Sequence, residues 1–211
     1  MSTLTGALVR LDPLSPGHAA GLAEAAAESR EHFGYSPIPH GVQDAERYIR
    51  TALTERDQGE SIPYAVIDLR RNKVAGSTRF LDIDCWSGPP WIVEPAAAAM
   101  ALGATPTVAE IGHTWLAASA QRTGINVEMK LLMLTLAFDD WQCLRITLKT
   151  DARNQRSRTA IAAIGATFEG VRRAHLPAID GGIRDSAYYS IVAAEWPAVR
   201  DLLRARLDRN R

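Results

Sequence analysis

The spacing of apolar and polar residues along the chain predicts short strands that alternate with amphipathic helices. In the first half, the pattern predicts a strand over 6–11, a helix from Ser15 to about Arg30, a helix over 42–57, and strands over 61–69 and 73–83. Residues 70–72 join the last two strands, and Asn72 tolerates the positive φ of a tight turn, so these strands are expected to form a hairpin.

The second half begins with a strand, a helix and a strand, over 110–117, 124–140 and 143–150. Their short connections fit two neighbouring parallel strands. Asn154 is suited to cap a further helix that Gly165 ends, and strands over 166–176 and 184–193 and a helix from Glu195 complete the order. The pattern predicts one α/β (α+β) domain over residues 1–211, a mixed sheet flanked by helices, with residues 85–108 as its longest loop.

Charge and cysteine content narrow the class of protein. The chain holds 24 Lys plus Arg and 24 Asp plus Glu, so its net charge gives no reason to expect a nucleic-acid partner or an anionic membrane. Cys85 and Cys143 are too few for a disulfide framework and lack metal-ligand spacing, so we expect no metal. The first residues do not resemble a signal peptide, and no apolar run approaches the length of a membrane span. These features predict a cytoplasmic protein.

Residues 121–127 place hydrogen-bond donors and a glycine directly before an apolar helix. The first turn of a helix has backbone N–H groups without partners and carries the positive end of the helix dipole, so it suits an anion. Gly124 lets the main chain approach a ligand closely and adopt unusual φ values, and Gln121 and Arg122 add side-chain donors. The turn is a candidate pyrophosphate site, although a purely structural helix start fits the glycine equally well.

Motifs on both sides of this turn carry a more specific signal. The segments "EIGHTWLA", "QRTGIN", "DARNQRSRTAIAAIGATFEG" and "RDSAYYSIVAAEW" resemble the GCN5-related N-acetyltransferase (GNAT) superfamily, and among its members the RimJ/RimL-like branch, named for ribosomal-protein N-terminal acetyltransferases. The resemblance at motif level runs from Glu110 to Trp196. It implies a mostly antiparallel central sheet whose two parallel strands splay apart, and a homodimer is common among similar folds.

The resemblance further implies acetyl-CoA as cofactor, with its pantetheine arm paired like an extra strand in the slot between the splayed strands. The family's pyrophosphate loop usually reads Q/R-x-x-G-x-G/A, and here Asn126 occupies the second small position, which puts the cofactor affinity in question. The residues assigned to the cofactor are Thr114, Trp115, Leu116, Gln121, Arg122, Thr123, Gly124, Ile125, Asn126, Val127, Asn154 and Ser157. Asn154 and Ser157 also fit a helix cap and an ordinary first-turn serine. Glu128 and Lys130 are interpreted as a solvent-facing or intrahelical pair, with contact of Lys130 with a cofactor phosphate as the alternative.

Direct transfer of an acetyl group to an amine needs little beyond a base that takes the amine proton and a donor near the sulfur. Glu110 is the first candidate for the base, where similar enzymes often carry a glutamate. Strand alternation sends His113 to the opposite face, where a packing role is expected. Ser157 and then Tyr189 are the candidates for the donor near the sulfur.

The acceptor is expected opposite the cofactor, between the segment 32–40 and the long loop that contains Trp86 and Trp91. Asp185 is placed there to orient an acceptor ammonium, with a turn role as the alternative. The residues assigned to the acceptor are His32, Tyr35, His40, Trp86, His113 and Asp185. The resulting expectation is an acetyl-CoA-dependent N-acetyltransferase that acts on a protein N-terminus or a small-molecule amine. A non-catalytic acyl-CoA-binding module with the same fold is the alternative.

Overall fold

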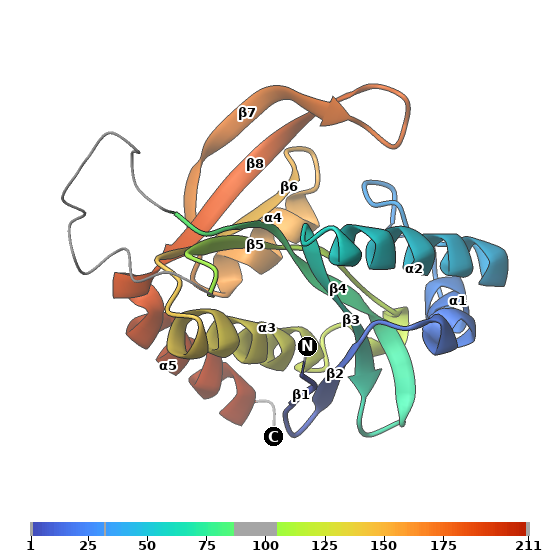
Figure 1. Ribbon diagram of the computed structural model, residues 1–211, viewed down its shortest axis with the longest axis horizontal. Helices are drawn as coiled ribbons and strands as arrows, with labels where there is room; N and C mark the ends of the chain where they lie inside the picture. Colours follow the sequence, from blue (N-terminus) through green and yellow to red (C-terminus); the bar gives the residue numbers. More distant parts are fainter. Residues whose placement is uncertain (1, 32, 87–104, 210–211) are drawn as a thin grey trace.

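One open sheet organises the computed structural model, which describes residues 2–31, 33–86 and 105–209 (Figure 1). The strands lie in the order β1-β2-β3-β4-β5-β6-β8-β7. Their bounds are β1 Leu4–Thr5, β2 Val9–Pro13, β3 Ser61–Asp68, β4 Lys73–Asp84, β5 Val108–Leu116, β6 Arg145–Asp151, β7 Thr167–Pro177 and β8 Ile183–Val192. Neighbours pair antiparallel except β5 and β6, which are parallel. The mixed, mostly antiparallel sheet expected from the sequence is confirmed.

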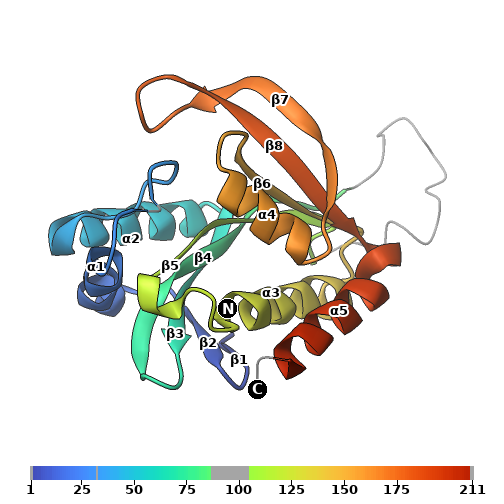
Figure 2. The ribbon, with the colours of Figure 1, turned by 180° about the vertical axis from the view of Figure 1, so that it is seen from behind.

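Helices cover this sheet in separate groups. Their bounds are α1 Ala19–Ala27, α2 Gly41–Asp57, α3 Ile125–Thr135, α4 Gln155–Ala163 and α5 Trp196–Asp208, and a π-helical turn extends α3 through Leu136–Asp140. Helix α1 packs on α2 and β4, α3 packs on β2 and α5, and α4 packs on β6 and β8. In both ribbon views the β7–β8 hairpin projects beyond the helices (Figure 2). The hairpin therefore has solvent-facing surface of its own.

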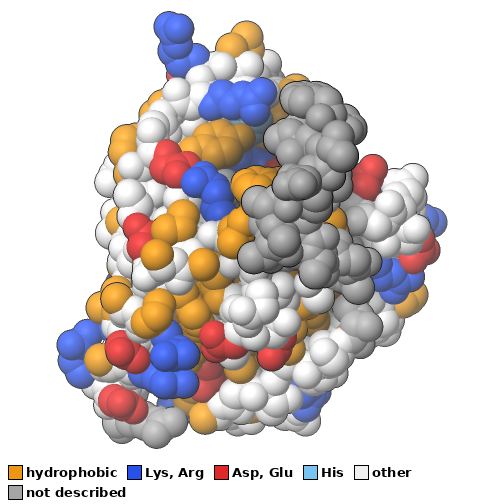
Figure 3. Space-filling view, turned by 60° about the vertical axis from the view of Figure 1, so that its left-hand side comes forward, with side chains coloured by type: hydrophobic (Ala, Val, Ile, Leu, Met, Phe, Trp, Pro, Cys, Tyr) orange, Lys and Arg blue, Asp and Glu red, His pale blue; other side chains and the backbone are white. Residues whose placement is uncertain are grey.

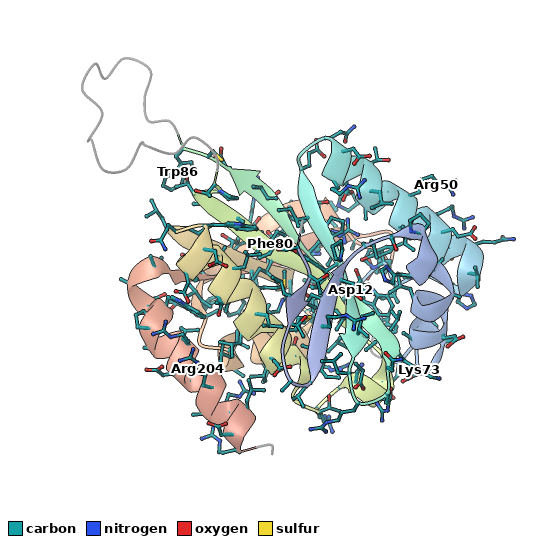
Figure 4. All side chains as sticks on the ribbon, turned by 60° about the horizontal axis from the view of Figure 1, so that its bottom comes forward. Asp12, Arg50, Lys73, Phe80, Trp86 and Arg204 are labelled. Atoms are coloured by element: carbon teal, nitrogen blue, oxygen red, sulfur yellow. The ribbon has the colours of Figure 1, made fainter. Side chains whose placement is uncertain are left out.

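The apolar faces of these elements meet in one core. Ala45, Ile49 and Ala52 recur along the buried face of α2 at helical spacing, as predicted from the pattern. Phe80 of β4 is fully buried, and its ring centroid lies 4.7 Å from that of Trp141. Figure 4 shows Phe80 in the interior, whereas the labelled Arg50, Lys73 and Arg204 lie at the periphery.

Element boundaries differ from the sequence prediction where local hydrogen bonds compete. The first predicted strand begins late, because Gly6 N donates to Val9 O at 2.9 Å in a turn between β1 and β2. Ser15 starts a short 3-10 turn over Pro16–His18 instead of an α-helix, and its amide donates to Nδ1 of His18 at 3.1 Å. Cys143 lies before β6, with its thiol 3.1 Å from the carbonyl of Pro106. Of the predicted long loop, residues 87–104 lie outside the described residues.

Acidic and basic side chains alternate over the face shown in the space-filling view (Figure 3), in keeping with the balanced charge. Among the described residues, no helix is both long and apolar enough to span a membrane. In the same part of the chain, His, Cys, Asp and Glu side chains form no group of three or more that could hold a metal ion.

Candidate active site

The parallel strands β5 and β6 pair over three residues only, Val108–Glu110 with Arg145–Thr147. Beyond that point the facing edges of β5 and β6 have no ladder between them, while the opposite edges stay paired with β4 and β8. A cavity of about 760 Å³ occupies this opening. The splayed parallel pair expected from the sequence is confirmed, and it presents strand edges to which an extended ligand can add.

The bend before α3 opens into the same cavity through Gln121, Arg122 and Asn126. Within the described part of the chain, the amides of residues 122–124, 126 and 127 donate to no acceptor. The bend is braced from behind, because Thr123 Oγ1 donates to the carbonyl of Ala120 at 2.7 Å and Gln121 Nε2 to that of Leu116 at 2.9 Å. An open helix start of this kind favours a phosphate.

Gly124 serves this bend through its backbone, with φ of +91° at the N-cap of α3. A Cβ there would lie 3.0 Å from Cδ1 of Leu8 and 3.8 Å from Cδ2 of Leu207, and Gly124 does not line the cavity. A Cβ at this position would thus meet Leu8, and the expected close approach of the main chain to a ligand stays a prediction. The glycine is needed for its positive φ, which other residues adopt at a cost.

Two arginines stand where this bend and the start of α4 border the cavity. Arg122 and Arg156 both line it, and neither forms an ion pair with a described residue. Burial and then the nearby Arg122 lower the pKa of Arg156, which places the two cations close together. Together with the free amides, these guanidiniums fit the negative charge of a diphosphate.

Glu110 lies at the end of the short parallel ladder and lines the cavity with its side chain 3% exposed. Nζ of Lys149 is 2.6 Å from Oε2 of Glu110 and 3.1 Å from Oδ2 of Asp82. Burial raises the pKa of Glu110 to about 7, against the attraction of Lys149, which lowers it. Gly112 leaves space for the carboxyl group, since a Cβ there would lie 2.7 Å from Oε1. The site thus holds a carboxyl group that titrates near neutral pH.

A bulge in β5 places His113 beside this group. Residues 113 and 114 together face Thr78 of β4, and His113 has φ of +47°. The strict alternation that would send Glu110 and His113 to opposite faces fails here, and both residues line the cavity. Loss of hydration among the cavity walls, and then the cations Arg79, Lys149 and Arg184, lower the pKa of His113 to about 4. Its imidazole is therefore neutral at pH 7.

Lys130 is buried in α3 and lines the cavity, so the interpretation that it faces solvent is wrong. Its Nζ donates to Oγ1 of Thr114 at 2.9 Å, and Thr114 Oγ1 lies 2.8 Å from Oγ1 of Thr78. Burial lowers the pKa of Lys130 to about 7, and the charge of Glu110 opposes this effect. A second group that titrates near neutrality thus lies under the opening between the strands.

Glu128 is also buried, but it is structural. Its carboxylate accepts from the amides of Ala7, Leu8 and Val9 at 2.9, 2.6 and 2.8 Å. A Cβ on Gly6 would overlap the carboxyl group of Glu128, so a larger residue there would displace that group from the three amides. These bonds attach the N-terminal strands to the helix whose first turn borders the cavity.

The far end of the cavity is walled by three segments that Arg153 connects. Its guanidinium binds Asp151 at 2.8 Å and Asp180 in the β7–β8 turn at 2.7 Å, and it lies 5.2 Å from the ring centroid of Tyr35. Tyr35 and its neighbours up to Ile38 line the cavity, as do Leu176–Ile179. The wall opposite the bend is thus built from parts distant in sequence.

A family model described as an acetyltransferase (GNAT) domain matches residues 9–167. The chain belongs to the GNAT acetyltransferase family. A candidate ribosomal N-acetyltransferase of Bacillus subtilis, YdaF, is 32% identical over 88 residues, which are 42% of this chain and 47% of YdaF. The match therefore spans about half the length of that curated relative.

Solved GNAT structures share the whole fold. A GCN5-related N-acetyltransferase from Brucella melitensis is 25% identical with a TM-score of 0.81, covering 97% of this chain and 84% of that one. Mycobacterium smegmatis RimJ in complex with CoA-disulfide is 22% identical with a TM-score of 0.75, covering 97% of this chain and 94% of that one. The names of YdaF and RimJ agree with the RimJ/RimL-like branch expected from the sequence.

The structure brings most of the predicted GNAT site residues to one cavity. Those that line it are Tyr35, Glu110, His113, Thr114, Trp115, Leu116, Gln121, Arg122, Asn126, Asn154 and Ser157. Asn154 caps α4, since its Oδ1 accepts from Ser157 N at 3.0 Å, so the capping interpretation holds. Contact of these residues with acetyl-CoA or an acceptor stays a prediction.

Other predicted residues lie away from the cavity. Thr123, Gly124, Ile125 and Val127 belong to the bend and first turn of α3 but do not line the cavity. Tyr189 is buried, and its hydroxyl accepts from Arg158 Nε at 3.2 Å. Tyr189 does not line the cavity, and its role as donor near the sulfur stays a prediction.

Three residues predicted for the acceptor also fall outside the cavity lining. His40 is exposed at the N-cap of α2, and Trp86 is 48% exposed at the end of β4, where Figure 4 shows it apart from the core. Asp185 Oδ1 accepts from Ala174 N at 2.8 Å, which supports the turn role. His32 and Trp91 lie outside the described residues.

Sequence reasoning missed several polar residues of the cavity, namely Asp82, Lys149, Arg156 and Arg184. Lys149 carries a weak signal, because it is one of two charged residues, with Arg145, in the strand "CLRITLKT". Arg184 starts a strand and carries no such signal, since charged residues are common at that place.

Proposed function

We propose that this chain transfers an acetyl group from acetyl-CoA directly to a primary amine. One observation carries the proposal. The opening between β5 and β6 joins the bend before α3, through Gln121, Arg122 and Asn126, to the buried carboxyl group of Glu110 within a single cavity. When bound, acetyl-CoA supplies a thioester whose carbonyl carbon is open to attack by an amine.

The chain's own groups divide the binding between two regions. The amides of the bend, with Arg122 and Arg156, hold the diphosphate. The facing backbone edges of β5 and β6 beyond the ladder pair with the amides of the pantetheine arm. Asn126 lines this path with a half-buried side chain, so its amide group adds a polar contact.

Glu110 accepts the proton that the amine loses as its nitrogen bonds to the acetyl carbon. Its pKa of about 7 leaves a substantial ionised fraction at neutral pH, and Lys149 orients the carboxylate from 2.6 Å. The C–S bond breaks as the N–C bond forms, and the sulfur leaves as a thiolate or takes a proton from Ser157, whose hydroxyl regains one from water. No covalent bond to the protein is required.

The acceptor is a protein N-terminus or a small-molecule amine, and the name of YdaF favours a ribosomal protein. We also propose a cytoplasmic location, which the free thiols Cys85 and Cys143 favour. The homodimer that similar folds often form stays a prediction.

The test combines calorimetric titration of CoA with release of free thiol from acetyl-CoA in the presence of amines, including peptides with ribosomal N-terminal sequences. Arg122→Gln removes one guanidinium and is expected to weaken CoA binding about 10-fold. Arg173→Gln, on the exposed face of β7, is the matched control and is expected to bind as the wild type does. CoA binding without turnover on any amine would indicate the acyl-CoA-binding module, and absence of CoA binding would refute both.

A further inference from the structure

Several of the cations in and around the cavity form ion pairs with carboxylates. The ion-paired sets are Lys149 with Glu110 and Asp82, Arg153 with Asp151 and Asp180, and Arg79 with Glu55. Arg184 of β8 lines the same cavity, yet it forms no ion pair with any residue in the described ranges. Arg184 interacts with Asp151 at longer range and, after the hydrogen bonds and charge of Arg153, lowers the pKa of that carboxyl group. A half-buried guanidinium with no carboxylate at ion-pair distance can still bind an anion.

The guanidinium of Arg184 is held in place from one side. Its Nε donates to Oγ of Ser186 at 2.9 Å, and Ser186 is fully buried. The same hydroxyl lies 3.0 Å from Nδ1 of His175, whose Nε2 is 3.2 Å from the hydroxyl of Tyr188. The terminal nitrogens of Arg184 donate to no described residue, so the two of them are free to bind one carboxylate.

The electrostatics of this end of the cavity agree with that geometry. His113 stands in the electrostatic field of Arg184, Lys149 and Arg79, and these cations, after the loss of hydration, keep its ring neutral. Leu176, the register partner of Arg184, also lines the cavity and gives the guanidinium an apolar neighbour. A carboxylate beside Arg184 would be attracted by the guanidinium, would meet no described carboxylate in direct contact with it, and would be repelled by Asp151 only at longer range.

We propose that the amine acceptor carries a carboxylate and that Arg184 binds it. This inference rests on the proposed function, because it names the chemistry of the acceptor for the same site. Arg184 would hold one end of the acceptor while Glu110 receives the proton of the amine at the other. The carboxylate belongs either to a free amino acid or to an acidic side chain close to a peptide N-terminus, and the experiment separates these sources.

The experiment compares acceptors in matched pairs, with kcat/KM measured by thiol release. One pair is an amino acid and its amide, and the other is a peptide with Glu or with Gln at its second position. The wild type is expected to prefer the acid of one pair by at least about 10-fold, which corresponds to one charge-assisted hydrogen-bonded contact. Arg184→Gln is expected to abolish that preference and leave CoA affinity unchanged, whereas Arg173→Gln retains both.

Titration of each pair into the CoA-saturated protein gives a second readout that needs no turnover. Tighter binding of the acid than of its neutral partner supports the inference, and the pair that shows it identifies the source of the carboxylate. Equal kcat/KM and equal affinity within both pairs, or a preference that survives Arg184→Gln, would overturn it. Those results would leave the proposal of acetyl transfer intact. If the wild type does not bind CoA, the proposed function is overturned as well.

Discussion

The raised pKa of Glu110 leads to a prediction with a defined size. A pKa of about 7 in place of 4.5 means that ionising Glu110 costs about 3 kcal/mol more than ionising an exposed glutamate. Because only the ionised carboxylate accepts a proton, kcat/KM should rise with pH, reach half its maximum near pH 7 and level off about one unit higher. Glu110→Gln should remove this rising part of the pH profile, called the acid limb below, and should lower the maximal kcat/KM by roughly 10²–10⁴-fold.

The assay is a pH profile of kcat/KM, measured with one amine for all variants so that the ionisation of the acceptor is common to them. Lys149→Met is the matched variant, because the cation 2.6 Å away lowers the pKa of Glu110. Its removal should move the acid limb above pH 7 without abolishing it. An acid limb that persists in Glu110→Gln, or that stays in place in Lys149→Met, would refute the assignment of this carboxyl group as the base.

Stability gives a check that is independent of catalysis. The folded state binds the Glu110 proton more tightly than the unfolded state, so this group favours folding below about pH 4.5 and loses that contribution as pH rises through about 7. Relative to the wild type, Glu110→Gln should therefore gain about 3 kcal/mol in free energy of unfolding between pH 4 and pH 8. Urea denaturation at both pH values measures this difference. If the free energies of unfolding of the wild type and of Glu110→Gln change equally with pH, burial does not raise the pKa of Glu110.

Three further substitutions test how the fold supports the site. Glu128→Gln turns an NH₂ group toward the amides of residues 7–9, and should lower the free energy of unfolding by about 2–4 kcal/mol and Tm by roughly 5–15 °C. Thermal denaturation measures the change, with the exposed Glu24→Gln as control, and an unchanged Tm would contradict the prediction. Gly124→Ala forces alanine to adopt φ of +91° with its Cβ close to Leu8, and should lower the free energy of unfolding by about 1–2 kcal/mol with little change in CoA affinity. If calorimetry instead shows weaker CoA binding at unaltered stability, this position contacts the ligand. Gly112→Ala places a Cβ 2.7 Å from Oε1 of Glu110, and should lower kcat/KM at least about 10-fold while CoA still binds. If this variant keeps the kcat/KM of the wild type, the carboxyl group of Glu110 has room to move.

The sequence predicts the order and type of most elements because their apolar spacing is regular. The helix Gly41–Asp57 and the hairpin of β3 and β4 follow from local pattern alone, with Asn72 at φ of +51° in the turn. The splayed pair was reached through family resemblance, since no local signal says where a parallel ladder stops. The ladder ends at Glu110 and Thr147, although β5 continues to pair with β4 and β6 with β8 beyond it.

Prediction of the site failed where long-range contacts override local pattern. Lys130 and Glu128 are charged residues in a helix, which usually face solvent, yet a hydroxyl of β5 and three amides of β2 and its preceding turn give them partners in the interior. His113 was assigned by alternation, and a single extra residue in β5 changed its side. Arg184 became a candidate only when its neighbours were known, because its distinguishing feature is the lack of a carboxylate at ion-pair distance within the described chain.

The three-residue ladder between β5 and β6 also bears on mechanics. It is the backbone ladder that connects a five-stranded part of the sheet, β1 to β5, with a three-stranded part, β6 to β8. Hydrogen exchange should therefore be faster for amides on the facing edges just past Glu110 than for those within either part. If the proposed thioester arm lies in this opening, relative motion of the two parts would change the width of the slot that receives it.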